Sequence, residues 1–326
     1  MQPTSFIHSF PRPQKDESEV QVQQRALKIL TLIKELGFVM APEVVEWNSE
    51  MMGLNKKPLQ ILQRRVCFTE INASELKEHS KQFGPIALSF DKTVLRDVGA
   101  MPVIYSPQGT GGPLSELATF AVKAASATKH VMSQFQELKV SSDATTVQSK
   151  LQGTPIDPDY LLELTNTNSQ GKVDAIFKIK AADAKGLLQY VGYNNIPFDH
   201  SIGMFNIFLN MFYPTDNLHN NESLGYYRLR EWRIIAGDLN INGKPLGRTL
   251  TPEEIKKVIA VDPTFWNKSV KVDGKTQQRK ELALIYQPTT ENWNPLDHIE
   301  AIYAPSTIHD QIRAIVGGAI PIHTPA

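Results

Sequence analysis

Apolar and polar positions alternate in short blocks along most of this chain, and the period of the alternation changes from block to block. Residues 6–10 alternate with period two and stop at two prolines, which predicts a short strand because proline cannot donate a hydrogen bond to a sheet. Residues 20–36 place apolar side chains at steps of three and four, which predicts an amphipathic helix that Gly37 closes. The β-branched and aromatic run 65–71 predicts a second strand.

The rest of the chain continues as a mixture of short strands and helices. Asn72 and Glu75 have the spacing of a capping box, at the start of a helix that we expect to end near Phe83–Gly84. The segments predicted after it are strands over 86–90 and 103–105, a long alanine-rich helix over 114–138, a polar loop over 141–158, a strand over 173–180, a buried helix over 202–213, a strand over 226–236, a tight turn at 242–243, a capped helix from Thr251, a strand over 299–303, a helix over 306–316 and an edge strand over 320–322.

This order of elements does not alternate regularly enough for a doubly wound parallel sheet, and the sequence contains no G-x-G-x-x-G. We therefore predict the α+β class and a single domain over 1–326. The loop 141–158 is expected to be an insertion or a lid. The segment 237–290 matches no motif.

Charge and composition narrow the class of protein. Lys+Arg and Asp+Glu both number 34, so the net charge is zero, which argues against a nucleic-acid coat or a membrane-surface binder. A hydrophobic fraction of 41% supports a folded core, and no apolar run approaches the length of a membrane span. Charged residues stand where a signal peptide would need its apolar core, so we expect a soluble, cytoplasmic protein. Lys56–Lys57 with Arg64–Arg65 is a local basic patch for nucleic acid or, more plainly, a solvated face.

Several kinds of catalytic site are excluded by the motifs. The single Cys67 rules out an internal disulfide and a cysteine-based zinc site, and in a β-branched strand it is expected to be a buried, inert thiol. The eight histidines show no zincin spacing, so no metal is expected, and no G-x-S-x-G is present. The glycine-rich piece 108–113 lacks the context of a phosphate loop.

Two strands stand above this background as candidate sites. The first carries His8, and the second carries Glu231 between aromatic residues and arginines. Strand alternation puts Glu231 on the same face as Arg233 and puts Trp232 on the other face. A carboxylate in mid-strand is costly to bury unless it is paired, so Glu231 is either part of a structural ion pair or a site residue. Both interpretations stay open.

Several short motifs resemble a block found in the AbiGi-like abortive-infection proteins of bacteria. These motifs are Val66–Ile71, the helix that contains His79, Phe83–Lys92, Met101–Tyr105, Arg230–Arg233 and the closing unit Ile299–Val316. The similarity is spread over most of the chain. It implies a role in phage defence, and it makes 237–290 a family-specific insertion that forms a lid or a partner surface.

Proteins of this type also look like distant members of the ADP-ribosyltransferase fold, in which two small antiparallel sheets hold nicotinamide adenine dinucleotide (NAD) in a cleft. The resemblance implies split antiparallel sheets with flanking helices, with His8 and Glu231 as catalytic residues. A fixed carboxylate would stabilise the oxocarbenium-like ribose that forms when nicotinamide departs. The residues implied to hold NAD are Phe68, Thr69, Ser89, Phe90 and Arg233.

The sequence departs from that fold at one position that matters. Phe83 stands where the family's glycine-containing strand carries a tyrosine, and Pro85 stiffens the turn after it. Two functional hypotheses therefore stand side by side. One is an NAD-dependent transferase or NAD glycohydrolase, with a nucleic-acid acceptor as its weaker form. The other is a non-catalytic antitoxin or sensor subunit that binds a protein partner encoded nearby, a toxin or effector.

Overall fold

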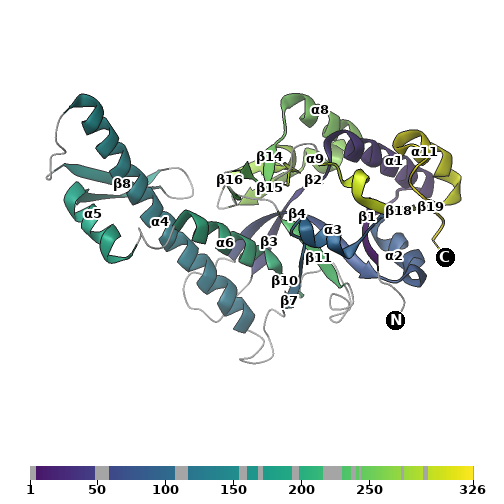
Figure 1. Cartoon of the computed structure of the whole chain (residues 1–326), viewed down its shortest axis with the longest axis horizontal. Helices are drawn as coiled ribbons and strands as arrows, with labels where there is room; N and C mark the ends of the chain where they lie inside the picture. The colour runs from purple at the N-terminus through teal and green to yellow at the C-terminus, as the bar shows by residue number, and fades with distance from the viewer. Residues whose placement is uncertain are drawn as a thin grey trace.

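The computed structural model describes most of the chain, in a body of sheets and helices from which a long helical arm projects (Figure 1). The described residues are 5–47, 59–106, 117–153, 160–167, 172–192, 198–215, 230–235, 240–241, 244–272, 275–288 and 293–325. The glycine-rich piece 108–113, the turn at 242–243, Lys56–Lys57 and the first part of the strand predicted over 226–236 lie outside them.

The body is built on an eight-stranded sheet whose strand order is β19-β18-β5-β1-β4-β11-β6, with β3 paired beside β4. All pairs are antiparallel except β18 with β19. The strands are β1 (Ser5–Phe10), β3 (Pro42–Trp47), β4 (Leu59–Ile71), β5 (Ile86–Phe90), β6 (Met101–Pro102), β11 (Glu231–Ile235), β18 (Ile299–Tyr303) and β19 (Ile322–His323). The strands predicted over 6–10, 65–71, 86–90 and 299–303 are confirmed, and the molecule is of mixed α and β composition.

One face of this sheet forms the main core. Strand alternation turns Phe6, Phe68 and Phe90 to this side, where each is at most 2% exposed. They pack against the apolar stripe of α1 (Glu19–Leu36), which contributes Ala26, Leu27, Leu30 and Ile33 to the same cluster. We call this side of the sheet the α1 face and the opposite side the polar face.

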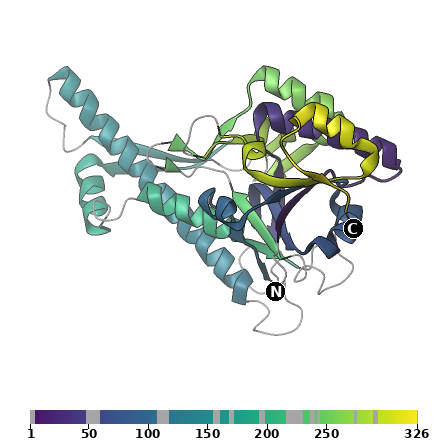
Figure 2. The same cartoon turned by 45° about the vertical axis from the view of Figure 1, so that its right-hand side comes forward.

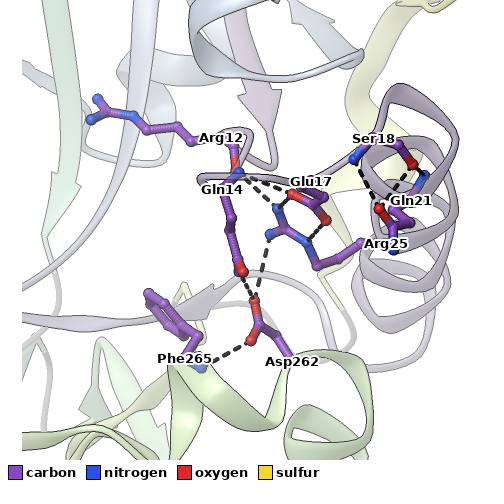
Figure 3. A network of polar contacts seen from close by, with 8 residues as sticks. All are labelled: Arg12, Gln14, Glu17, Ser18, Gln21, Arg25, Asp262 and Phe265. Carbon is purple, nitrogen blue, oxygen red and sulfur yellow. Dashed lines mark hydrogen bonds and ion pairs between the residues drawn. The ribbon is translucent and has the colours of Figure 1, made fainter.

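Helix α1 begins and ends as its sequence predicts. Ser18 caps it in a capping box with Gln21, and Gly37 closes it with φ of +79°. The segment before the helix is fixed to the body by a polar network (Figure 3). Arg25 donates to both carboxylate oxygens of Glu17, and Gln14 donates to Asp262 at 2.8 Å. Asp262 also caps the first turn of the helix that contains Phe265, so the network joins the N-terminal segment to the start of that helix.

The segment 237–290 is part of the body and covers the outer side of α1. Strand β2 (Val39–Met40) pairs with β17 (Leu284–Tyr286), which pairs with β14 (Gly247–Thr249). Apolar residues of α8 (Pro252–Val261) and α9 (Pro263–Trp266) share a buried cluster with Leu32 of α1. The other elements here are β12 (Asn240–Ile241), β13 (Lys244–Pro245), β15 (Ser269–Val272), β16 (Lys275–Gln278) and α10 (Arg279–Leu282). This packing is that of a structural layer, and the capping box predicted at Thr251 is confirmed.

Short helices complete the body. A 3-10 turn over Ala73–Glu75 follows Asn72, whose backbone N–H donates to the Glu75 carboxylate, and α2 (Leu76–Phe83) comes after the turn. The remaining elements of the body are α3 (Lys92–Asp97), α11 (His309–Val316) and 3-10 turns over Pro295–His298 and Ser306–Ile308. The strand predicted over 103–105 is observed one residue later as β7 (Ile104–Ser106), which pairs with β10 (Phe212–Pro214), and Val103 separates it from β6 in the main sheet.

The arm is formed by the distal part of α4 with the hairpin β8–β9 and helix α5, and it projects from the body in both views (Figures 1 and 2). Helix α4 (Leu117–Gln152) has 36 residues and is therefore about 54 Å long. Its base packs with α6 (Phe198–Met211) on the body, in a cluster that contains Val122 and Leu209. Farther out it carries the other elements of the arm, β8 (Leu161–Thr167), β9 (Val173–Lys180) and α5 (Ala181–Tyr190).

The arm corrects one sequence expectation and confirms another. The loop predicted from residue 141 is helix up to Gln152, because no glycine or proline interrupts the chain before Gly153. Serine and threonine lower helix propensity only slightly, so they do not end it. The strand predicted over 173–180 is confirmed with the same bounds.

Candidate functional site

The polar face of the main sheet carries a row of polar side chains where β4 and β11 meet. Glu231 lies opposite Thr69 in the register of the two strands, and Arg233 lies opposite Cys67. Residues that are directly opposite in an antiparallel pair point to the same face, so these four side chains share the polar face. Alternation along β4 adds Gln63 and Arg65 to the row.

The carboxylate of Glu231 is buried and has two close partners. Nε of Arg233 donates to Oε1 at 2.7 Å, and the hydroxyl of Tyr105 donates to Oε2 at 2.5 Å. Burial by itself would raise the pKa of Glu231, but the charges of Arg233 and Arg65 outweigh it and lower the pKa to about 2. Glu231 is therefore a fixed negative charge at neutral pH and cannot act there as a proton donor.

Two buried arginines and two carboxylates balance each other in this cluster. Arg233, whose side chain is 2% exposed, also donates to Gln63 at 3.2 Å. Arg65 donates to the same Gln63 oxygen at 2.5 Å and forms an ion pair with Glu43 of β3. Two guanidinium groups thus face two carboxylates, which is the condition under which buried charges are tolerated.

The ring of Tyr213 in β10 contacts the guanidinium groups of both arginines, on the side of the sheet that α4 and α6 cover. The guanidinium carbons of Arg233 and Arg65 lie 4.7 Å and 5.3 Å from its ring centroid, within the range of cation–π contacts. Its hydroxyl donates to Glu43 at 3.2 Å. The polar cluster, which we define as Glu43, Gln63, Arg65, Tyr105, Tyr213, Glu231 and Arg233, therefore joins the main sheet to the layer above it.

The thiol of Cys67, beside the cluster, and the hydroxyl of Tyr105, within it, both stay protonated. Burial raises the pKa of the Cys67 thiol to about 11, and the neighbouring charge of Glu231 adds to that effect. Burial, followed by the charge of Glu231, also raises the pKa of Tyr105 above its usual range. Neither group is activated as a nucleophile. The inert thiol expected for Cys67 agrees with this environment.

A groove of about 350 Å³ runs along one side of Glu231, at the edge of the sheet where β11 meets β6. Its lining residues are Glu70, Pro102, Val103, Tyr105, Arg230, Glu231 and Trp232. Arg230 forms an ion pair with Glu75 at 2.7 Å, with both side chains partly exposed. The groove is thus lined by aromatic rings and by both signs of charge, and it is the opening through which a small molecule could approach Glu231.

His8, the other predicted catalytic residue, lies on the opposite face of the sheet. Its neighbour Ile7 is opposite Thr69 on the polar face, so alternation sends His8 to the α1 face. There its ring lies 5.2 Å from the ring of Phe38 and 5.7 Å from that of Phe68. Nδ1 donates to the carbonyl of Cys67 at 2.8 Å, and burial lowers the pKa of His8 to about 4. The structure does not bring His8 and Glu231 into one cleft.

The residues predicted to hold NAD are divided in the same way. Phe68 and Phe90 are at most 1% exposed in the main core on the α1 face, 5.5 Å apart between ring centroids. Thr69 and Ser89 are buried on the polar face, since each lies opposite Ile7 in its strand pair. Only Arg233 contacts Glu231 directly. The assignment of these residues to a cofactor remains a prediction.

Sequence reasoning missed Tyr105, Tyr213, Gln63 and Glu43. The alternation of polar residues along β4, at Gln63, Arg65 and Thr69, was a usable signal. An alternating polar face is ordinarily interpreted as solvated, and nothing in the pattern says that another layer covers it. Tyr213 in particular lies at the end of a segment that was expected to be a helix.

The alternative sites fare differently. Arg64 donates to the carbonyl of Leu282 and Arg65 belongs to the polar cluster, so the part of the predicted basic patch that the structure describes is engaged internally. Among the described residues, no three His, Cys, Asp or Glu side chains are placed to hold a metal ion. Within the same ranges, no helix combines the length and apolarity needed to cross a bilayer.

Comparison with known proteins identifies the family. A family model described as "Putative abortive phage resistance protein AbiGi, antitoxin" matches residues 44–260, two thirds of the chain. The chain belongs to the AbiGi family. No curated protein and no solved structure matches the chain significantly. The matched range contains the arm, β4, β11 and all of the polar cluster except Glu43, whereas His8 and the closing unit 299–316 lie outside it.

The AbiGi match also bears on the segment 237–290. Residues 237–260 lie inside the matched range and 261–290 lie outside it, and the assignment of 237–290 as a family-specific insertion stays a prediction. The similarity to the ADP-ribosyltransferase fold, which the sequence motifs implied, stays a prediction for this AbiGi protein.

Proposed function

We propose that this AbiGi-family protein acts in abortive phage resistance as an antitoxin, which binds a toxin protein from the same defence system and restrains it. The observation that carries the proposal is the family match over residues 44–260, whose description names an antitoxin. The match covers the arm together with all of the polar cluster except Glu43, so the function would belong to this whole region.

The chemistry of the polar cluster supports binding over catalysis. Glu231 is neutralised by Arg233 and hydrogen-bonded by Tyr105, which leaves it no proton to give at neutral pH. A buried, charge-balanced network of this kind fixes how two layers pack, and its members support the fold.

The surface supports the same proposal. Nine of the large apolar side chains that are more than a third exposed belong to the arm: Val131, Val140, Tyr160, Leu161, Val173, Ile176, Phe177, Leu187 and Tyr190. Exposed apolar side chains that gather on one part of a molecule are typical of protein interaction sites. An enzyme that works on a small molecule does not need them.

Co-production with the toxin of the same operon tests this proposal. We expect the toxin alone to arrest growth, the pair to grow, and the pair to co-purify as a complex of defined mass by size-exclusion chromatography with light scattering. A toxin whose arrest persists in the presence of this folded protein, with the two eluting separately, would remove the antitoxin function.

A second function is kept because the groove gives access to Glu231. We propose it as the alternative in which NAD enters the groove and the fixed carboxylate of Glu231 stabilises the positive ribose as nicotinamide departs. The contacts of Glu231 favour the electrostatic part of this role. His8 has no part in it, because its side chain points to the α1 face.

The alternative is tested by nicotinamide release from NAD, measured with the purified protein alone and with its toxin. Release that disappears in Glu231→Gln, at a temperature where circular dichroism shows the variant folded, would establish the alternative. Absence of release from the wild type under both conditions would eliminate it and leave the antitoxin function untouched.

A further inference from the structure

The hairpin of the arm has an unusual exposure for a two-stranded sheet. Strand β9 pairs with β8, and no other described strand pairs with either. Seven of the eight residues of β9 are exposed, and only Ile179 is partly covered. A hairpin of two strands is marginally stable in water and presents two open edges, which makes it a template for another strand.

Apolar side chains are exposed on both sides of β9. The packing of the hairpin against α4 and α5 does not cover them. Ile179, Leu162 and Leu164 face helices α4 and α5, where they pack with Leu138 and Leu188. Phe177 lies opposite Leu164 on that same side yet is 58% exposed.

On the other side of the strand, Ile176 is 55% exposed. A strand added at the free edge of β9 would contribute neighbours to both sides at once. An occupant that covers only one side would leave the other side exposed.

The sequence of β9 complements itself in one antiparallel register. A two-fold axis that pairs a strand with its own copy must set residue k opposite residue k of the copy, so residues whose numbers sum to 2k face each other. With Phe177 at the axis, Asp174 lies opposite Lys180 of the copy. Ala175 then lies opposite Ile179 of the copy, and Phe177 opposite Phe177. Opposite charges meet at both ends of the seven paired residues. Between them Ala175 lies opposite Ile179, Ile176 opposite Lys178, and Phe177 opposite itself.

The neighbouring registers all oppose like charges. Centring on 174 or on 178 sets Asp174 or Lys178 against itself. Centring on 175 or 176 sets Lys172 against Lys178 or Lys180, and centring on 179 sets Lys178 against Lys180. Like charges directly opposite each other destabilise a strand pair. Of the registers centred on 174 to 179, only the one centred on Phe177 avoids this.

We propose that two copies of this chain associate through the free edges of their β9 strands, paired antiparallel about Phe177, to form a four-stranded sheet with the order β8-β9-β9-β8. The occupant of this edge is a second copy of the chain, because in this register the charges of β9 are complementary to those of the same strand in the copy. The interface is isologous, closes on itself and leaves no free β9 edge. It does not depend on the antitoxin function.

Sedimentation velocity of the purified full chain tests the interface. We expect a dimer at micromolar concentration and a monomer for Phe177→Asp, which places two carboxylates at the axis. Tyr190→Asp is the matched control, since Tyr190 is 89% exposed on α5 and lies outside the paired strand. A monomeric wild type, or a Phe177→Asp variant that stays dimeric, overturns the proposal.

A charge exchange tests the register, and it does not depend on Phe177. Asp174→Lys should weaken the dimer by about tenfold, because each copy then sets two lysines opposite each other. The double variant Asp174→Lys with Lys180→Asp should recover the wild-type dissociation constant. Recovery by Lys178→Asp in place of Lys180→Asp, or no recovery by either, would contradict pairing about Phe177.

Discussion

At the scale of single residues, the polar cluster shows how one ion pair on a sheet can decide the packing of two layers. Glu231 and Arg233 come from the same strand, two residues apart, and their side chains meet on the polar face. The sequence left open whether Glu231 is part of a structural ion pair or a site residue. The contacts with Tyr105 and Tyr213 show what it supports, since both tyrosines come from strands outside β4 and β11.

Removal of the carboxylate should destabilise the protein strongly. In Glu231→Gln the guanidinium of Arg233 stays buried without its counter-charge, which costs about 3–5 kcal/mol of unfolding free energy. Glu78→Gln is the matched control, because Glu78 pairs with Lys81 on the surface and should cost at most about 1 kcal/mol. Urea denaturation of the three proteins at pH 7 measures both values. Equal stability of the two variants would show that the pair contributes nothing.

The destabilising effect of Glu231→Gln on the fold should disappear at acidic pH. The folded pKa of Glu231, about 2, lies below its ordinary value of 4.5, so its contribution is complete above pH 4.5 and disappears as the pH falls towards 2. The difference between these values corresponds to about 3 kcal/mol. The unfolding free energies of wild type and Glu231→Gln should therefore converge between pH 4.5 and 2. A constant difference over that interval would contradict the assignment.

His8 should make stability depend on pH in a higher interval. Burial lowers its pKa from 6.5 to about 4, so the unfolded chain binds a proton in this interval that the folded protein does not. Stability is complete above about pH 6.5 and falls as the pH drops towards 4, by about 3 kcal/mol from this residue. His8→Phe should flatten the profile of unfolding free energy between pH 6.5 and 4. The slope that remains is expected from His79, whose pKa is also lowered to about 4.

At the scale of elements, sequence periodicity located most of the strands and helices of the body. Strand β9, helix α1 and the capped α8 follow their local patterns closely, because turns, caps and alternation are properties of neighbouring residues. The limits of α4 and the division of β6 from β7 did not follow. The end of α4 follows from the absence of glycine and proline before Gly153, whereas β7 depends on pairing with β10, a segment far away in the chain.

Gly84 should be far less tolerant of substitution than another glycine of similar conformation. It ends α2 with φ of +128°, and a Cβ there would lie 2.3 Å from the carbonyl carbon of Phe10 in β1. Gly84→Ala should therefore cost about 3 kcal/mol or more, since backbone atoms would have to move. Gly99→Ala, at φ of +77° with no atom within 4 Å, should cost only about 1–2 kcal/mol. Thermal unfolding of the two variants decides this, and equal losses would contradict it.

At the scale of the whole molecule, a body with buried apolar clusters carries an arm that leaves large apolar side chains exposed. The body buries its largest apolar cluster on the α1 face, and a second apolar cluster on the polar face, which contains Val45 and Ile61, packs under α4 and α6. The arm keeps exposed apolar residues far from that core. Composition alone could not predict this division, because the same apolar fraction fits a chain with its apolar side chains distributed evenly.

The candidate site was predictable in two residues, Glu231 and Arg233, and not in its surroundings. Glu231 and Arg233 were visible as a charged pair in an otherwise aromatic and apolar strand. The separation of His8 from Glu231 depended on the register of β1 against β4, and a shift of one residue would have placed both on one face. The motifs of the AbiGi family were recognisable because they follow these strands.

The central claim is that this protein works by binding a protein partner and that Glu231 supports the fold without performing chemistry. The most direct measurement is growth of cells that produce the toxin of the same operon together with wild type or Glu231→Gln, at a temperature where both are folded and equally abundant. We expect both to restore growth equally. Failure of folded Glu231→Gln to restore growth, while Glu78→Gln and the wild type succeed, would contradict the claim and return Glu231 to a catalytic role.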